Sequence, residues 1–234
     1  MDCIADITVS AVYVYRQPFD LRDYRRQTLQ TQATICIFRR TPHCIVSISL
    51  VLALCMCTVA GTTVCIASGC FRSVVVHRDQ VYAADINKNE TQVFEYNDTP
   101  SPRWTHIRSI EHDFEQNGLP LTLSISNNQL NCCSNSIGSI KVYSLSGELL
   151  QTYGTRGCGG DDKLNCPFIG DDDDDGSVLI VEYHINRLLV MSEQGEIGVL
   201  QLQPPVSGPR SAVLLNNQLY VTSWDDEAIY RYSC

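Results

Sequence analysis

The chain has 234 residues, with 17 Lys and Arg against 26 Asp and Glu and a formal net charge of -9. The acidic excess lies after residue 70: residues 1–70 hold six basic and four acidic side chains, which leaves 11 and 22 for residues 71–234. Such a surface repels a phosphate backbone, so nucleic-acid binding is disfavoured and we expect a protein or a small ligand as partner.

Residues 1–43 contain no motif that predicts a fold or a function. Residues 44–69 differ, because the stretch from Thr41 to Phe71 includes no Asp, Glu, Lys or Arg. A helix needs about 20 mostly apolar residues to cross a bilayer, and we therefore predict a transmembrane helix over residues 44–69. The same run is rich in Val, Ile, Thr and Cys, which leaves a pair of buried strands as the alternative.

Arginines set the expected orientation of this helix. Arg39 and Arg40 directly precede the run, and the positive-inside rule then places the N-terminus in the cytosol and residues 72–234 outside. Asn89 and Asn97 begin Asn-x-Thr sequons, which predict glycosylation on that side. A cytoplasmic location is the alternative if the run does not enter a membrane.

The cysteines predict no metal centre. No CxxC pair occurs among the seven cysteines of the first 70 residues, so a zinc site is disfavoured there. Cys158 and Cys166 enclose a short loop of Gly, Asp, Lys, Leu and Asn that a disulfide would close in an oxidising compartment. Two free thiols in a reducing compartment are the alternative.

Four stretches after residue 72 share one pattern of short apolar strands separated by polar turns. They are residues 74–96, 123–150, 170–197 and 212–233. Their second strands align at positions 48, 49 and 40 residues apart, namely Tyr82, Leu130, Leu179 and Leu219. Such spacings suit the blades of a β-propeller. No segment after residue 72 keeps an apolar stripe at helical spacing beyond a turn or two, so the prediction for residues 72–234 is all-β.

The third repeat carries a family resemblance. The run GTRGCGGDDKLNCPFIGDDDDDGSVLIVEYHINRLLVMSEQGEI, residues 154–197, has a Gly-rich loop, Leu and Pro, an apolar strand, a turn with Gly, a second strand and an Asn-Arg pair. It resembles an NHL repeat, whose motif positions fall on Gly154, Gly157, Gly160, Leu164, Pro167, Gly176, Asn186 and Arg187. The repeat at 74–96 matches in part, and the other two keep only the strand pattern. The resemblance implies a β-propeller or partial propeller of about four NHL-like blades.

In the NHL family the Asn-Arg pair stabilises blade packing, which is the role the resemblance implies for Asn186 and Arg187. Some propellers that resemble NHL repeats are lyases or lactonases, whose metal is held in the central channel by residues from several blades. The sequence contains no GxSxG, HExxH or P-loop, and four histidines fall at no matching points of the repeat: His77, His106, His112 and His184. We therefore predict no catalytic residue, no metal and no cofactor, with a metal-dependent propeller enzyme as the weakest alternative.

The predicted function is a non-catalytic binding or scaffold module, anchored to a membrane through residues 44–69. The alternative is a soluble NHL-repeat relative of TRIM-type ubiquitin ligases that lacks the RING and B-box. Aromatic residues are enriched among interface anchors, and the candidates for a binding face are Trp104, Trp224, Tyr183 and Tyr230. For each of them, however, we expect packing in the core or between blades, with the binding face as the alternative. Four repeats would leave an open array whose strand edges favour self-association.

Residues 171–175 are five consecutive aspartates, and we predict that they occupy a turn between two strands. The other repeats have polar residues at the same point, such as Asn127 and Asn128. Asp175 followed by Gly176 suits a hairpin turn, because Gly accepts a positive φ and Asp tolerates one. Calcium is the alternative, but five adjacent aspartates cannot all converge on one ion.

Overall fold

The computed structural model of the chain describes residues 5–8, 11–14, 35–38, 44–49, 53–58, 63–97, 103–114, 118–120, 122–134, 136–157, 163–172, 176–215 and 217–233. These residues form β-sheets, antiparallel except for one short parallel pair, together with one short 3-10 helix, in agreement with the all-β prediction. They form two compact units. The first comprises residues 1–88 and 92–108, and the second comprises residues 89–91 and 109–234.

The first unit begins with a two-stranded sheet of β1 (Ala5–Thr8) and β2 (Ala11–Val14). A four-stranded sheet follows, in the order β3-β4-β5-β6. Its strands are β3 (Ile35–Phe38), β4 (Cys44–Ser49), β5 (Ala53–Thr58) and β6 (Thr63–Ser68).

The prediction of a transmembrane helix over residues 44–69 is wrong, because β4, β5 and β6 occupy that run. Three six-residue strands replace the predicted helix, each rich in Val, Ile, Thr or Cys, which pack well on a pleated surface. Within the described ranges, no helix has the length and apolar character that a membrane crossing requires. The location of the chain and the glycosylation of Asn89 and Asn97 stay predictions.

The next sheet has the order β10-β9-β8-β7. Its strands are β7 (Phe71–His77), β8 (Gln80–Asp85), β9 (Glu90–Asn97) and β10 (Arg103–Glu111). Leu54 of β5 packs into the core of this sheet, together with Phe71, Val74, Val81 and Phe94. The N-terminal sheet therefore supplies part of the hydrophobic core that the first repeat needs.

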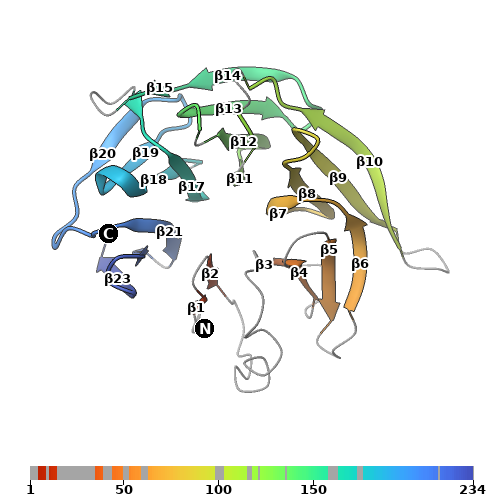
Figure 1. The fold of residues 1–234 in the computed structure, drawn as a ribbon, viewed down its shortest axis with the longest axis horizontal. Helices are drawn as coiled ribbons and strands as arrows, with labels where there is room; N and C mark the ends of the chain where they lie inside the picture. The colour runs from red at the N-terminus through yellow and green to blue at the C-terminus, as the bar shows by residue number, and fades with distance from the viewer. Residues whose placement is uncertain are drawn as a thin grey trace. The chain divides into compact units, whose positions relative to one another are not determined.

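The second unit contains three larger sheets (Figure 1). The first consists of β11 (Thr122–Ser126), β12 (Gln129–Ser134), β13 (Ser139–Ser144) and β14 (Leu149–Tyr153). The second consists of β17 (Pro167–Asp172), β18 (Val178–Glu182), β19 (Arg187–Met191) and β20 (Ile197–Leu200), with the 3-10 helix η2 (Tyr183–Ile185) between β18 and β19. The third consists of β21 (Pro209–Leu215), β22 (Gln218–Ser223) and β23 (Ala228–Ser233).

Inside the second unit the first strands of the three sheets lie side by side, with β17 between β11 and β21. Apolar side chains fill the space between successive sheets. Cys133 and Ile140 pack with Ile169, Ile180 and Leu189 between the first and second sheets. A second cluster joins the second sheet to the third and contains Leu179, Val181, Leu188, Ala212, Leu219 and Val221.

The four predicted repeats coincide with four sheets. The aligned residues Tyr82, Leu130, Leu179 and Leu219 lie in β8, β12, β18 and β22, the second strand of each sheet, and all four are buried. The alignment by spacing was therefore correct. The sheet β3–β6 lies outside these repeats, and of it the sequence predicted only a pair of buried strands, as the alternative to the helix over residues 44–69.

The aspartate run begins inside a strand. Asp171 and Asp172 are the last residues of β17, and Asp173 to Asp175 fall outside the described residues. Gly176 follows with φ of 85°. A Cβ on Gly176 would lie 2.0 Å from the side-chain amide nitrogen of Asn127, so Gly176 lies beside the β11–β12 turn. The prediction of a turn is therefore wrong for Asp171 and Asp172, and for Asp173 to Asp175 it stays a prediction.

Candidate functional site

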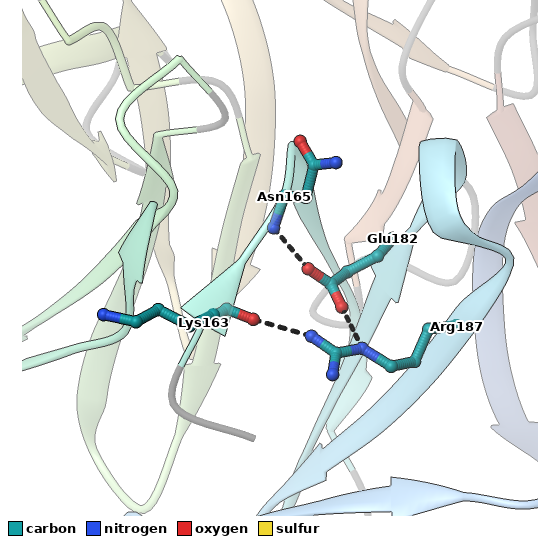
Figure 2. Close-up of polar contacts among 4 residues, drawn as sticks. All are labelled: Lys163, Asn165, Glu182 and Arg187. Atoms are coloured by element: carbon teal, nitrogen blue, oxygen red, sulfur yellow. Dashed lines mark hydrogen bonds and ion pairs between the residues drawn. The ribbon is translucent and has the colours of Figure 1, made fainter. Parts of the chain in front are cut away.

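Arg187, one of the residues named for its resemblance to the NHL motif, lies in a buried ion pair with Glu182. Figure 2 shows this pair together with its neighbours. Glu182 ends β18 with no exposed surface, and its Oε2 accepts a hydrogen bond from Arg187 Nε at 2.5 Å. Its other oxygen accepts the Asn165 N–H at 2.5 Å, while Arg187 Nη2 donates to the Lys163 carbonyl at 2.6 Å. The pair thus ties β18 and β19 to the segment that precedes β17.

Asn186 connects the same sheet to the segment that precedes β21. It adopts a left-handed conformation with φ of 52° after the 3-10 turn, a conformation that Asn tolerates better than most residues. Its Oδ1 accepts the Gly208 N–H at 2.8 Å, directly before β21. Asn186 and Arg187 therefore bond their sheet to the chain segments on both sides, while their role as an NHL motif stays a prediction.

Other residues of the motif lie in the segment that precedes β17 or at the start of that strand. Gly154 has φ of 77°, and a Cβ there would meet Leu164, which is fully buried. The Gly157 N–H donates to the Leu164 carbonyl at 3.2 Å where β15 (Thr155–Arg156) pairs with β16 (Lys163–Leu164). Pro167 begins β17, and Gly160 falls outside the described residues.

A polar surface adjoins Asn186, and we call it the Asp225 surface; it consists of Tyr183, His184, Ser207, Trp224 and Asp225. Asp225 accepts hydrogen bonds from Tyr183 OH at 3.2 Å and from Ser207 Oγ at 2.9 Å. The Trp224 N–H donates to the Gly208 carbonyl at 2.8 Å. Three chain segments thus meet here: the turn before β19, the segment before β21 and the β22–β23 turn.

The Asp225 surface is open to solvent. Trp224 is 47% exposed, the highest value among the exposed large hydrophobic residues of the described chain, and His184 and Asp225 are exposed as well. The Tyr183 and His184 rings make an edge contact at 5.0 Å. Partial desolvation, and then the bond to the Asp225 carboxylate, raise the pKa of Tyr183, so its hydroxyl remains a donor at neutral pH.

Tyr183 and Trp224, both candidates for a binding face, lie on this one surface. Tyr230 lies next to it, where its hydroxyl donates to Asp226 at 2.9 Å and its ring stacks on Tyr232. Trp104 lies elsewhere, half-buried in the first unit against Tyr96 at 5.3 Å. Trp104 therefore packs between strands, whereas the side chain of Trp224 is open to solvent.

Sequence reasoning missed a buried polar cluster around His112. His112 Nε2 lies 2.8 Å from Thr91 Oγ1 and 3.6 Å from Cys132 Sγ, and its ring makes an edge contact with Tyr143 at 5.0 Å. Burial, and then the charge of Lys141, lower the pKa of His112 to about 3, and burial raises the pKa of the Cys132 thiol. Both groups are therefore neutral at neutral pH, which excludes a thiolate nucleophile here.

Two hydrogen bonds also join His112 to Asn89, the residue directly before β9. The backbone N–H of His112 donates to the Asn89 carbonyl at 3.0 Å, and Asn89 Nδ2 donates to the His112 carbonyl at 2.7 Å. The amide that a glycan would modify is thus already engaged, whereas Asn97 at the end of β9 is exposed. We therefore expect Asn97, rather than Asn89, to be the better acceptor.

Among the described residues, no group of three or more His, Cys, Asp or Glu side chains is placed to hold a metal ion. Cys166 is a free thiol before β17, and Cys158, its predicted disulfide partner, falls outside the described residues. The disulfide stays a prediction.

Comparisons with known proteins support the fold. No family model matches the chain, and the search of curated proteins found no match. Among solved structures, a streptogramin B lyase aligns with a TM-score of 0.65 and 13% identity over 96% of this chain and 73% of its own length. A catalytically inactive virginiamycin B lyase from Staphylococcus aureus, solved with quinupristin, aligns with 0.64 and 14% identity over 99% and 77%. These neighbours support a β-propeller fold.

A third neighbour is named as a binding protein. It is an auxiliary nutrient binding protein from Bacteroides thetaiotaomicron, with a TM-score of 0.62 and 12% identity over 85% of this chain and 58% of its own length. Structural neighbours of this chain thus include both enzymes and a binding protein.

The similarity to lyases overturns our prediction that the chain is not an enzyme. That prediction rested on missing linear motifs and on histidines that do not recur from blade to blade. Neither is a physical requirement, because catalysis needs only a few side chains brought together by the fold, from any sequence positions.

Proposed function

We propose that the chain is an NHL-like β-propeller that recognises a protein or a small ligand through the Asp225 surface. The observation that carries the proposal is the exposed Trp224 beside a carboxylate that two hydroxyl groups from separate segments hold in place. Exposed aromatic side chains on a rigid scaffold are the usual anchors of recognition surfaces.

The chemistry of this surface favours a ligand with hydrogen-bond donors and a flat or apolar face. Asp225 is an acceptor, and the indole ring of Trp224 offers apolar area and a π-face to a cation. The strongly acidic balance of residues 71–234 adds a long-range attraction for positively charged ligands. Asn186, through its bond to Gly208, supports the backbone on which Trp224 is held.

The proposal is tested by measuring binding of the full chain to a glycan array and to an array of basic and acidic peptides. We expect at least one class of probe to bind, and Trp224→Ala and Asp225→Asn to weaken that binding by at least about tenfold, as truncation of an interface anchor does. Val199→Ala, at an exposed apolar side chain of β20, is the matched control and should bind normally. Binding that both site variants retain would refute this location.

Lyase activity is a second candidate, favoured by the alignment of 96% or more of the chain with two lyase structures. The assay is incubation of the full chain with quinupristin, followed by mass spectrometry of the product. Turnover that needs added divalent metal and is lost in His184→Ala would favour the enzyme and place its site at the Asp225 surface. Quinupristin that stays unchanged over many hours would exclude this substrate.

A further inference from the structure

The β22–β23 turn, residues 224–227, combines one aromatic side chain with three acidic ones. It consists of Trp224, Asp225, Asp226 and Glu227, and all four residues are exposed. Trp224 and Asp225 belong to the Asp225 surface, so the turn places two further carboxylates directly beside that surface.

The two aspartates of this turn accept hydrogen bonds from neutral hydroxyl groups. The donors are Tyr183 and Ser207 for Asp225, and Tyr230 for Asp226. Within the described residues, no Lys or Arg forms an ion pair with either aspartate or with Glu227. Arg210 of β21 stacks over the Phe168 ring at 4.4 Å instead. A hydroxyl donor orients a carboxylate without cancelling its charge, so the turn presents an uncompensated negative charge.

We propose that the Asp225 surface binds an arginine side chain of a basic peptide, an assignment that rests on the proposed function of this surface and names its ligand. A guanidinium is planar, carries five N–H donors in a fork that matches a carboxylate, and stacks on aromatic rings. Trp224 offers an exposed π-face of the kind that binds cations best. Within the described residues, Asp226 Oδ1 accepts no hydrogen bond, which leaves it open to the N–H groups of a ligand.

Charge favours this ligand over a neutral glycan or an acidic peptide. Residues 109–234 hold 17 acidic and six basic side chains, a balance that attracts cations and repels anions at long range. Lysine carries the same charge as arginine, but its ammonium is compact, strongly hydrated and without a planar face. Trp224 and the two aspartates therefore select arginine over lysine.

Fluorescence anisotropy with the full chain and three labelled peptides tests the ligand class. The peptides share one Gly-Ser backbone and carry either two arginines, two lysines or two citrullines, since citrulline keeps the shape of arginine without its charge. Relative to the arginine peptide, the lysine peptide should bind at least about threefold more weakly and the citrulline peptide at least about tenfold more weakly. An arginine peptide that binds no better than the other two overturns the assignment.

Two variants place the arginine on the surface. Asp226→Asn removes a charge and keeps the shape of the side chain, and Trp224→Leu keeps apolar area but removes the π-face. Each should weaken binding of the arginine peptide by at least about threefold. Glu193→Gln, which removes one charge from the exposed β19–β20 turn, is the matched control and should bind normally. The peptide comparison uses the unaltered chain, so it decides the ligand class even if a variant fails to fold.

The outcomes separate this assignment from the proposed function. A neutral glycan or an acidic peptide that binds, and is lost in both Trp224→Ala and Asp225→Asn, would keep the recognition surface and overturn the arginine ligand. An arginine peptide that binds the wild type, Asp226→Asn and Trp224→Leu equally well would be attracted by net charge alone, which also overturns the assignment. Loss in Glu193→Gln as large as in Asp226→Asn would lead to the same conclusion.

Discussion

Glu182 has no exposed surface, yet it lies where one guanidinium and one backbone amide satisfy its two oxygens. Arg187 in turn bonds the Lys163 carbonyl, so the pair joins three segments of chain (Figure 2). A buried carboxylate is costly without a partner, and a neutral amide of the same shape costs less, because it carries no charge into the interior. The two residues should therefore be strongly coupled in their contribution to stability.

Replacing Arg187 by Met tests this coupling. We expect Arg187→Met to reduce the free energy of unfolding by about 3–5 kcal/mol, because it leaves the Glu182 carboxylate buried and unpaired. The double variant Glu182→Gln with Arg187→Met should recover a large part of that loss. Urea denaturation of the four proteins of the cycle provides the measurement, and additive effects of the two substitutions would contradict the ion pair.

His112 predicts how stability depends on pH. Its ordinary pKa is 6.5, and in the fold it is lowered to about 3. The unfolded chain therefore takes up a proton at a higher pH than the folded chain does. The contribution of neutral His112 to stability is present above pH 6.5 and is lost as the pH falls from 6.5 towards 3, by about 1.4 kcal/mol per pH unit.

The measurement is urea denaturation of the full chain at several pH values between 4 and 7. His112→Gln keeps an amide that can bond Thr91 but does not titrate, so its stability should change less steeply with pH in this range. His184→Gln, at an exposed histidine, is the matched control and should retain the slope of the wild type. Equal slopes for all three proteins would show that His112 is not held neutral by burial.

At the scale of single elements, the turns depend on particular glycines. Gly138 has φ of 63°, and a Cβ there would lie 2.3 Å from the Leu164 carbonyl oxygen and 2.9 Å from Arg156 Cα. Both are backbone atoms of the paired strands β15 and β16, so neither moves without breaking that pairing. Gly198 in β20 is the opposite case, since a Cβ there would meet nothing within 4 Å.

These two positions give a matched pair of substitutions. Gly138→Ala should lower the free energy of unfolding by at least about 2 kcal/mol, from the left-handed backbone and the collision together. Gly198→Ala should leave it unchanged or raise it by up to about 1 kcal/mol, since Gly inside a strand costs entropy. Thermal denaturation of both variants compares them directly, and similar melting temperatures would contradict the close approach at Gly138.

The sequence predicted the elements that repeat and missed the contacts that do not. Spacing alone identified the second strands at Tyr82, Leu130, Leu179 and Leu219. The resemblance to an NHL repeat singled out Asn186 and Arg187, whose side chains bond Gly208 and Lys163. Glu182 and Asn165 were missed, because they are 17 residues apart and meet only in the folded chain. For the same reason, no local signal linked Ser207 to Asp225 or His112 to Thr91.

The error over residues 44–69 has a physical origin. An uncharged apolar run satisfies the length requirement of a membrane helix and the burial requirement of core strands equally well. The available signal was composition: Cys44–Ser49, Ala53–Thr58 and Thr63–Ser68 together are dominated by β-branched residues, Ser and Cys rather than by strong helix formers. Gly61 lies between the second and third of these strands, at a point where a continuous helix would be weakened.

At the scale of the whole molecule, the strands β4–β6 affect how well a shortened chain that lacks them can fold. The core of the sheet β7–β10 contains Leu54, which has no exposed surface, and Ile66 and Ala67 pack against it. Residues 72–234 alone would lose these side chains and Phe71. Each lost large apolar side chain costs about 2–5 kcal/mol, which is a large part of the stability of one sheet.

We therefore predict that residues 72–234 fold only in part. In hydrogen–deuterium exchange, amides of β7 and β8 should exchange rapidly in the shortened chain and slowly in the full chain, because Val74 and Val81 lose the cover of Leu54. Amides of β17 and β18, whose core lies wholly within the second unit, should be protected in both and provide the internal control. Slow exchange of β7 and β8 in residues 72–234 would show that the repeats are self-sufficient and that the N-terminal strands add nothing to this core.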